Sequence, residues 1–400
     1  MNLLPYFDRV LPDDADRATL LARVFDPECG GPCVAAIRGT TAVDITSAEP
    51  TVAGLLERSD AVDVVRNHDG GTTWQVQDLL EATLTRDRSR PHLLAPVDLQ
   101  VLKAAGVTFV RSMLERVIEE RAKGDPAKAE ALRTRLAEVI QGHISQVRPG
   151  SAEAQRVKQV LVEEGLWSQY LEVGIGPDPE IFTKAPVLSA VGAGAEIGVL
   201  ERSTWNNPEP ELVLAVTSGG TPVAATLGND VNLRDFEGRS ALLLPEAKDN
   251  NASCAIGPFL RLFDEQFTLD DARQVEVTLE ITGQDGYHSR GVNPVSEISR
   301  DVTELIRHAC GRHHQYPDGF VLFTGTMFVP TDDRDEPGKG FTHKKGDVVC
   351  ISSPRLGSLV NVVTYAEQAP EWTFGIRALM TNLAARGLLR GGAEETEAVA

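Results

Sequence analysis

Two short apolar runs joined by a pair of glycines constrain the fold of this chain most strongly. Residues 211–217 and 222–227 both read as β-strands, and the segment between them reads as a tight turn. In a two-residue Gly-Gly turn the flanking residues Ser218 and Thr221 face each other, which fixes the pairing of every residue further out. The sequence therefore predicts an antiparallel β-hairpin of defined register.

This register gathers three carboxylates, which we call the carboxylate trio: Glu209, Glu211 and Asp230. Side chains two apart on a strand share a face, and the count from the turn sets Asp230 opposite Glu209. The same count sets Gly228 opposite Glu211, where the missing side chain predicts empty space for a ligand. Three such acids repel one another unless a cation lies among them or their pKa values rise. Oxygen ligands suit Mg²⁺ or Mn²⁺, so we expect a divalent metal site; the alternative is an acidic patch at an exposed strand end.

Length and charge limit the classes of protein to which the chain can belong. At 400 residues it exceeds one average domain. We expect a small α/β domain over residues 1–95, a larger domain over 96–390 and a disordered acidic tail over 391–400. A net charge of -19 argues against nucleic acid or an anionic membrane as a partner. No apolar run reaches membrane-spanning length and the first residues lack a signal-peptide pattern, so we place the protein in the cytoplasm.

The 5 cysteines of the chain are scattered, which is typical of reduced thiols. Cys29 and Cys33 bracket Gly-Gly-Pro, but the sequence has no second cysteine pair elsewhere. The sequence therefore does not favour a zinc site.

Periodicity divides the rest of the chain into helical and strand-rich parts. The run GVTF reads as a strand that turns into a helix at Ser112. Further helices are expected over residues 125–144, 151–164 and 376–386, and Thr51 is expected to cap an earlier one. Alternating runs such as VEVTLEIT, GFVLFTGT and GDVVCIS predict a rolled, mostly antiparallel mixed β-sheet flanked by helices. These features together place the fold in the α+β class.

Five short phrases, in order along the chain, resemble the fumarylacetoacetate hydrolase family. They are Pro208-Glu209-Pro210-Glu211, Asn229-Asp230 with Arg234-Asp235, Lys248 ahead of Gly257-Pro258, Thr324-Gly325-Thr326, and Gly346-Asp347-Val348. The resemblance covers roughly residues 93–380. Several phrases in the right order are a specific signal, whereas a single one would not be.

The resemblance implies roles for individual residues. In the family, the residues that correspond to the carboxylate trio hold a divalent metal, usually Mg²⁺. Lys248 would lie beside the metal and the substrate, where its charge can stabilise an enolate oxygen. Lys184 matches a second lysine that lines the pocket. Thr326, with its neighbour Gly325, matches a segment that binds the substrate carboxylate.

One departure from the family pattern narrows the expected reaction. Hydrolytic members carry a His–Glu dyad that activates water, but here the histidine position is Ser112, and only Glu115 remains. An unassisted serine is a poor general base near neutral pH. The chain is thus more similar to the sugar-acid dehydratases of the family. That similarity implies loss of water from a 2-keto-3-deoxypentonate such as 2-keto-3-deoxy-D-xylonate, giving 2,5-dioxopentanoate, in a homodimer or homotetramer.

The sequence leaves two candidates for the catalytic base. We expect Lys184 or Lys248, with a lowered pKa beside the metal, to remove the C3 proton, and Glu115 to assist the departing hydroxide. Three further residues are expected to bind the hydroxylated end of the substrate: Arg111, Ser112 and Arg116. The rival functions are an acylpyruvate-type hydrolase or oxaloacetate-type decarboxylase on the same metal site, and a binding module without activity.

Overall fold

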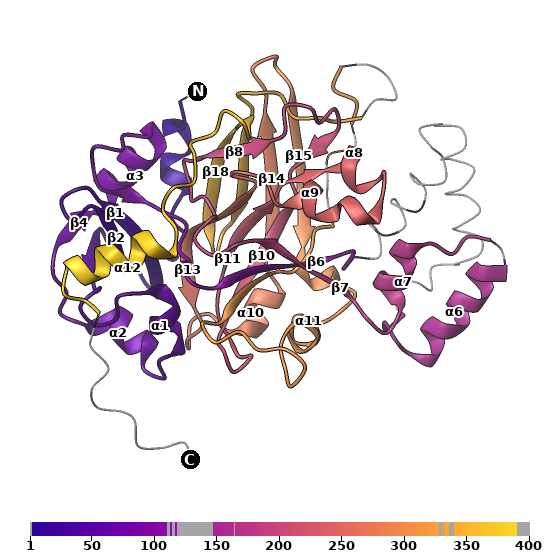
Figure 1. Ribbon diagram of the computed structural model, residues 1–400, viewed down its shortest axis with the longest axis horizontal. Coiled ribbons are helices and arrows are strands. Elements are labelled where there is room, and N and C mark those ends of the chain that lie inside the picture. Colours follow the sequence, from indigo (N-terminus) through magenta and orange to yellow (C-terminus); the bar gives the residue numbers. More distant parts are fainter. Residues whose placement is uncertain are drawn as a thin grey trace.

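Two β-sheets packed face to face form the centre of the molecule, with helices around them (Figure 1). This computed structural model describes residues 2–109, 113, 117, 147–163, 165–327, 330, 332–335 and 340–389. The α+β class predicted from the sequence is confirmed. The expected helix over residues 125–144 and the expected tail over 391–400 lie outside the described residues.

Among the described residues, the larger sheet has eleven strands, ten of them in the order β4-β3-β2-β1-β13-β11-β10-β16-β6-β7, while β5 pairs with β1. Strands β6 and β16 pair in parallel, and the other pairings recorded among the described strands of this sheet are antiparallel. The strands are β1 (Leu20–Asp26), β2 (Gly31–Arg38), β3 (Thr41–Asp44), β4 (Thr73–Gln75), β5 (His92–Leu93), β6 (Val101–Gly106), β7 (Glu180–Ala185), β10 (Pro210–Val216), β11 (Pro222–Asp230), β13 (Cys254–Leu262) and β16 (Phe320–Phe323).

The smaller sheet has five strands in the order β15-β14-β17-β18-β8, and a separate two-stranded ribbon joins β12 to β9. In the smaller sheet β8 is parallel to β18. The strands are β8 (Glu196–Val199), β14 (Glu276–Thr282), β15 (His288–Pro294), β17 (Val348–Ser353), β18 (Gly357–Tyr365), β9 (Asn206–Asn207) and β12 (Asn232–Leu233). The alternating sequence runs therefore form strands as predicted.

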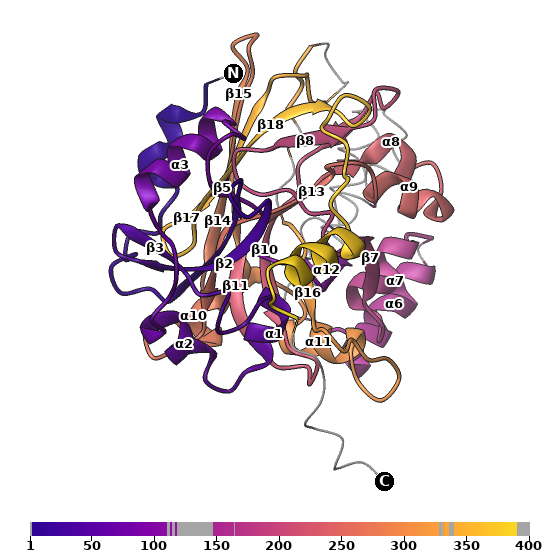
Figure 2. The same ribbon diagram turned by 60° about the vertical axis from the view of Figure 1, so that its left-hand side comes forward.

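The helices lie around the sheets rather than between them (Figures 1 and 2). Thr51 caps α1 as predicted, because its side chain accepts a hydrogen bond from the Gly54 N–H at 3.0 Å. The α-helices are α1 (Val52–Glu57), α2 (Ala61–Asn67), α3 (Val76–Thr85), α6 (Ala152–Glu163), α7 (Gln169–Ile175), α8 (Arg234–Glu237), α9 (Leu244–Lys248), α10 (Leu269–Arg273), α11 (Val302–Ala309) and α12 (Ile376–Ala385). Short 3-10 helices are η1 (Leu4–Arg9), η3 (Ala241–Leu243) and η4 (Val295–Glu297).

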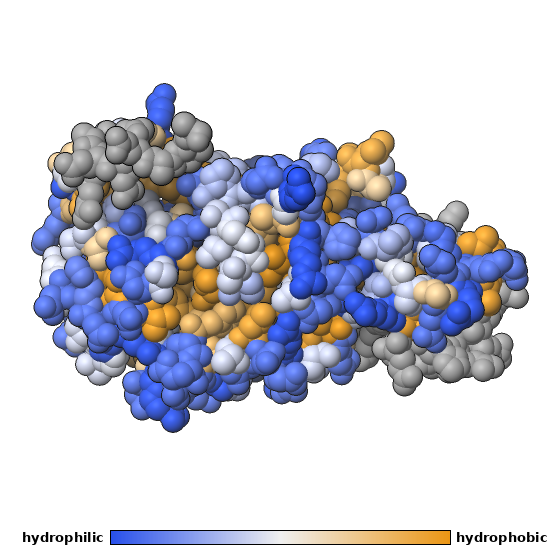
Figure 3. Space-filling view, turned by 90° about the horizontal axis from the view of Figure 1, so that it is seen from below, coloured by the Kyte–Doolittle hydropathy of each residue, from blue (hydrophilic) through white to orange (hydrophobic). Residues whose placement is uncertain are grey.

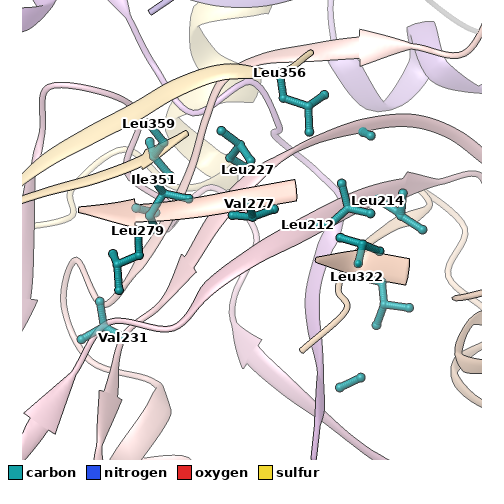
Figure 4. Packing of buried hydrophobic residues seen from close by; sticks show 14 of the residues in the cluster. Leu212, Leu214, Leu227, Val231, Val277, Leu279, Leu322, Ile351, Leu356 and Leu359 are labelled. Atoms are coloured by element: carbon teal, nitrogen blue, oxygen red, sulfur yellow. The ribbon is translucent and has the colours of Figure 1, made fainter. Parts of the chain in front are cut away.

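The main hydrophobic core fills the space between the two sheets. Leu212 and Leu227 come from β10 and β11 of the larger sheet, and Val277 and Ile351 come from β14 and β17 of the smaller one (Figure 4). All four side chains are buried. Each contributes about 1.5–3 kcal/mol by leaving water. This packing makes the β10–β11 hairpin a rigid base for the residues at its open end.

The predicted hairpin forms, but its turn differs from the prediction. Glu211 pairs with Gly228 as predicted, whereas at the other end Val216 pairs with Pro222. The Thr217 N–H donates to the Thr221 carbonyl, so the loop holds three residues instead of two. A register shift beside Val216 then restores the expected alignment.

A second local prediction was wrong. The run GVTF does not form a strand, because β6 ends at Gly106. Val107 has a φ of 54°, in the left-handed region that interrupts an extended strand. The chain therefore leaves the sheet three residues earlier than the pattern indicated, and the expected helix start at Ser112 lies outside the described residues.

The first four strands extend the larger sheet through the pairing of β1 with β13. The proposed boundary near residue 95 stays a prediction, since this hydrogen bonding runs across it.

Seen from below, hydrophobic side chains gather across the middle of the surface between hydrophilic borders (Figure 3). Among the described residues, no helix combines the length and apolar character needed to cross a membrane.

Candidate metal centre and active site

The carboxylate trio lies at the open end of the β10–β11 hairpin, as predicted. One oxygen from each of Glu209, Glu211 and Asp230 lies within 4.8 Å of the others. The Asp230 N–H donates to the Glu209 carbonyl at 3.0 Å, which fixes these two residues opposite each other. No residue of the trio is more than 4% exposed. The trio is therefore a buried site and not an acidic patch on an exposed strand end.

Neighbouring groups fix the backbone of Glu209 and the carboxylate of Glu211. The Asn229 side-chain oxygen accepts the Glu209 N–H at 3.1 Å. The Gly325 N–H donates to Glu211 Oε2 at 2.6 Å. Gly325 has a φ of 95°, a backbone conformation that glycine adopts readily. The Thr-Gly-Thr segment predicted to face the substrate is thus attached directly to a member of the trio.

The Glu211 carboxyl has a pKa raised well above its usual value. Burial is the largest cause, and the negative charges of Asp230 and Glu209 add to it. The Gly325 N–H and Lys248 oppose this shift. A divalent cation would remove the repulsion that raises this pKa, so the donor set fits a metal that prefers oxygen ligands.

Lys248, at the end of α9, supplies a positive charge to the same carboxylates. Its Nζ donates to Glu209 Oε2 at 2.5 Å and to Asp230 Oδ2 at 3.0 Å. Burial alone would lower the pKa of Lys248, but Asp230, Glu209 and Glu237 together raise it above the ordinary value. The ammonium ion of Lys248 is thus a counter-charge of the trio. The lowered pKa expected from the sequence applies beside a bound metal ion and stays a prediction.

Lys184, on β7, lies on the other side of Asp230. Its Nζ is 3.0 Å from Asp230 Oδ1 and donates to the carbonyl of Val231 at 3.1 Å. It also donates to the carbonyl of Lys248 and lies 3.4 Å from Ser253 Oγ. Its side chain is fully buried. These acceptors hold the ammonium group within the protein and tie β7 to the loop that carries Lys248.

Two residues near the site were missed in the sequence analysis. Asn232 Nδ2 donates to Glu209 Oε1 at 3.2 Å and to Glu237 Oε2 at 2.5 Å. Asn232 follows Asp230 by two positions, so the rule that alternate strand residues share a face could have found it. The Glu237 carboxylate contributes to the raised pKa of Lys248. Because α8 carries Glu237, only the fold could place it here.

Two buried amide oxygens at this end of the hairpin have no hydrogen-bond partner within the described part of the chain. They are Oδ1 of Asn207 and Oδ1 of Asn232, whose residues pair across the β9–β12 ribbon. An unpaired buried polar atom costs about 1–3 kcal/mol. Such atoms beside the carboxylate trio are expected where water or a hydroxylated ligand completes the site.

The space predicted beside Gly228 is filled. A side chain there would come within 2.5 Å of Phe323 and Val213. Gly228 makes room for core packing and not for a ligand, so that expectation was wrong.

The structure leaves part of the predicted site untested. Thr326 is described and almost buried, with 9% exposure. Four predicted residues lie outside the described part of the chain: Arg111, Ser112, Glu115 and Arg116.

The fold and the buried acidic site together define a divalent-metal enzyme of the α+β class built on two packed sheets. Residues 169–364 match the family described as fumarylacetoacetate (FAA) hydrolase C-terminal, and this part of the chain is a domain of that family. The resemblance found in the sequence is thereby confirmed.

Two relatives by sequence carry dehydratase names. A "Probable 2-keto-3-deoxyxylonate dehydratase" of Haloferax volcanii is 28% identical over 336 residues, 82% of this chain and 94% of that protein. A "2-dehydro-3-deoxy-D-arabinonate dehydratase" of Saccharolobus solfataricus is 34% identical over 185 residues, 46% of this chain and 58% of that protein.

Solved structures share the fold. The apo form of 2-keto-3-deoxy-D-arabinonate dehydratase superposes with a TM-score of 0.61 at 23% identity, covering 86% of this chain and 99% of the other. The same TM-score and identity hold for a structure of that enzyme complexed with magnesium and 2,5-dioxopentanoate. At this level of identity the likeness establishes the fold.

Proposed function

We propose that this protein removes water from a 2-keto-3-deoxypentonate, such as 2-keto-3-deoxy-D-xylonate, to give 2,5-dioxopentanoate. The observation that carries the proposal is the buried carboxylate trio with Lys248 at its edge. The dehydratase name of a relative that spans 82% of the chain supports the substrate. The magnesium in the structural neighbour supports Mg²⁺ as the metal, with Mn²⁺ as the alternative.

Glu209, Glu211 and Asp230 would hold the metal ion, which supplies Lewis-acid polarisation of a 2-keto acid and makes its C3 protons acidic. In the ammonium form Lys248 stabilises negative charge that develops on the keto oxygen. The Thr-Gly-Thr segment is attached to Glu211 through the Gly325 N–H, which supports a role for Thr326 in binding the carboxylate of a 2-keto acid.

The reaction needs a base for the C3 proton and an acid for the leaving C4 hydroxyl. The C3 proton and the C4 hydroxyl leave as water and a C3=C4 double bond forms. A C5 proton then moves to C3, and the resulting C4=C5 enol transfers its hydroxyl proton to C4, which gives the aldehyde at C5. We retain Lys248 as the candidate base once a metal ion replaces it as counter-charge of the trio. Glu115 remains the proposed acid. Lys184 keeps too many fixed acceptors to move freely, so we assign it the role of positioning Asp230 and the Lys248 backbone.

The test is incubation of the purified protein with 2-keto-3-deoxypentonate, with Mg²⁺ or with EDTA, and detection of 2,5-dioxopentanoate by mass spectrometry. We expect product only with the metal. As a matched control, Glu276→Gln changes an exposed glutamate on β14 and should leave turnover unchanged. Cleavage of a carbon–carbon bond in an acylpyruvate, with no dehydration, would refute the proposal and favour the hydrolase alternative.

We further propose that the protein is a homo-oligomer in the cytoplasm. Large hydrophobic side chains are exposed on and next to α12, among them Trp372, Ile376 and Met380. All the cysteines are free thiols, which suits a reducing compartment. Light scattering should give a dimer or tetramer, and the Ile376→Glu, Met380→Glu double variant should lower that mass. An unchanged mass would remove this face from the interface.

A further inference from the structure

We propose that the turn between β1 and β2 forms a second metal site, which binds a zinc-class divalent cation through Asp26, Cys29 and Cys33. One ligand atom from each residue lies within 4.8 Å of the other two. The sequence alone did not favour zinc here, because it shows no second cysteine pair. The fold supplies Asp26 as the third ligand. This site belongs to the N-terminal strands and does not involve the carboxylate trio.

The separation of the two sulfurs fits a shared tetrahedral cation. Cys29 Sγ and Cys33 Sγ are 3.8 Å apart. Two thiolates at ~2.3 Å from one zinc ion, at the tetrahedral angle, are separated by ~3.8 Å. A disulfide requires about 2.05 Å instead. The observed distance therefore matches ligands of one ion better than an oxidised pair.

The backbone of the hairpin brings the ligands together. Asp26 is the last residue of β1 and pairs with Gly31, the first residue of β2. Gly30 has a φ of 60°, which lets the intervening turn fold back over the strand ends. Asp26 Oδ1 accepts the Glu28 N–H at 3.0 Å, which fixes the carboxylate at the start of the turn.

Burial is uneven around the site. The Cys33 and Asp26 residues are 1% and 6% exposed, whereas Cys29 is only half-buried. The side of the site at Cys29 is thus open to solvent. A water molecule can take the fourth position there, as in zinc sites with three protein ligands.

The C-terminal helix α12 completes the surroundings of the thiols. Arg386, directly after α12, places Nη2 3.3 Å from Cys33 Sγ and donates through Nη1 to the Pro32 carbonyl at 2.8 Å. Asn382 donates to the Cys29 carbonyl at 2.9 Å. A side chain on Gly31 would come within 2.4 Å of the Asn382 amide, so the helix packs directly on the turn.

The charges at the proposed site largely offset one another. The two thiolates and the Asp26 carboxylate carry three negative charges, which a divalent cation and the Arg386 guanidinium would offset. The Asp44 carboxylate near Cys33 adds one more negative charge. N–H donors to metal-bound sulfur are typical outer partners of such sites. The cation would therefore fasten the β1–β2 turn to α12.

Cobalt tests this site, because Co²⁺ substitutes for zinc and a thiolate–cobalt bond gives a near-ultraviolet charge-transfer band that carboxylate ligands do not give. The full-length reduced protein is titrated with Co²⁺ in excess Mg²⁺, which occupies the carboxylate trio. We expect one equivalent to produce the band. Cys33→Ser and Cys29→Ser should abolish it, and the half-buried Cys310→Ser should retain it. Circular dichroism spectra establish that each variant is folded.

Two further variants sharpen the test. Asp26→Asn should weaken Co²⁺ binding by at least 10-fold, and Arg386→Met should weaken it by about 10–100-fold as the loss of an outer partner. Glu211→Gln should leave the band intact while dehydration is lost, which separates this proposal from the proposed function. Absence of the band in the wild-type protein, or its persistence in Cys33→Ser, would overturn the site. A Cys29–Cys33 disulfide in freshly reduced protein, shown by a mass lower by two hydrogens, would do the same.

Discussion

Two buried lysines lie 3.0 Å from opposite oxygens of Asp230, and their surroundings separate their roles. Lys248 bonds two carboxylates of the trio, so a metal ion can displace it from them. Lys184 instead donates to backbone carbonyls that no metal ion would release. The sequence analysis named both lysines as candidate bases, because a sequence motif does not show which atoms accept hydrogen bonds from a lysine.

Replacing Lys184 should therefore lower the stability of the folded protein and not only its activity. Lys184→Met removes the ion pair with Asp230 Oδ1 and the donor to the Val231 carbonyl, and we expect it to lower the free energy of unfolding by about 3–5 kcal/mol. Urea denaturation measures this loss. The control Lys103→Met removes a lysine on the neighbouring strand β6 and should change stability by less than about 0.5 kcal/mol. Equal stability of Lys184→Met and the wild type would show that its contacts are not structural.

Glu211 is the trio member for which a neutral replacement is most informative. Glu211→Gln keeps the volume, and its amide oxygen can still accept the Gly325 N–H, so the fold should survive. We expect Mg²⁺ affinity and dehydration rate to fall by more than about 100-fold, since even outer partners of metal ligands cost roughly 10–100-fold. Calorimetric titration with Mg²⁺ measures the affinity. Unaltered affinity would exclude Glu211 as a ligand.

At the scale of elements, the register of the hairpin could be predicted from the sequence, but the length of its turn could not. Side-chain alternation specifies which residues of β10 and β11 share a face, and burial of one face penalises any slip. The loop length depends on where a bulge is placed, and no residue near Val216 marks it. The prediction assumed neither the longer loop nor the register shift, and the two cancel at Glu211 and Gly228. The end of β6 was missed for a similar reason, because a positive φ at Val107 has no sequence signal.

Helix α11 allows a separate test at this scale. Asp301 caps it, accepting the Thr303 N–H at 2.9 Å and the Arg273 Nε at 2.8 Å. Burial alone would raise the pKa of Asp301, but Arg273 and Thr303 lower it to about 2. The stabilisation is thus fully present above the unfolded pKa of about 3.9 and is lost as pH falls through about 2.

Asp301→Ala should therefore lower the free energy of unfolding by about 0.5–2 kcal/mol at neutral pH. The difference from the wild type should shrink as pH falls from about 4 towards 2, because the wild-type carboxylate then becomes protonated. Thermal unfolding at several pH values measures it. Asp270→Ala, which removes an exposed partner of the same Arg273, serves as the control and should have little effect. A pH-independent difference would mean that the charge of Asp301 does not matter.

At the scale of the whole molecule, the sequence predicted the α+β class, the mostly antiparallel pairing and the family domain. It did not predict that the N-terminal strands continue the larger sheet through β1 and β13. Strand patterns predict which segments are strands, but the pairing of segments more than two hundred residues apart leaves no local mark. The same limit hid the contact of α12 with the β1–β2 turn, which depends on both ends of the chain.

Mg²⁺ should stabilise the whole protein against heat, because it binds the folded carboxylate trio and finds no such arrangement in the unfolded chain. At a free concentration 100 times its Kd, the stabilisation is about 2.7 kcal/mol. Differential scanning calorimetry with Mg²⁺ and with EDTA measures the shift of Tm. Asp230→Asn should abolish the shift, and a shift that persists in that variant would place the ion elsewhere.

The proposed metal ion can leave this site without unfolding the protein. Two ammonium groups already lie among the three buried acids, so departure of the proposed ion would leave a net charge of about minus one rather than minus three. Under the proposed function, uptake of the ion would exchange one cation for another, and Lys248 would leave its carboxylates for the bound substrate. The protein would then be emptied and refilled while folded, and the lysine would be released for catalysis only when the ion arrives.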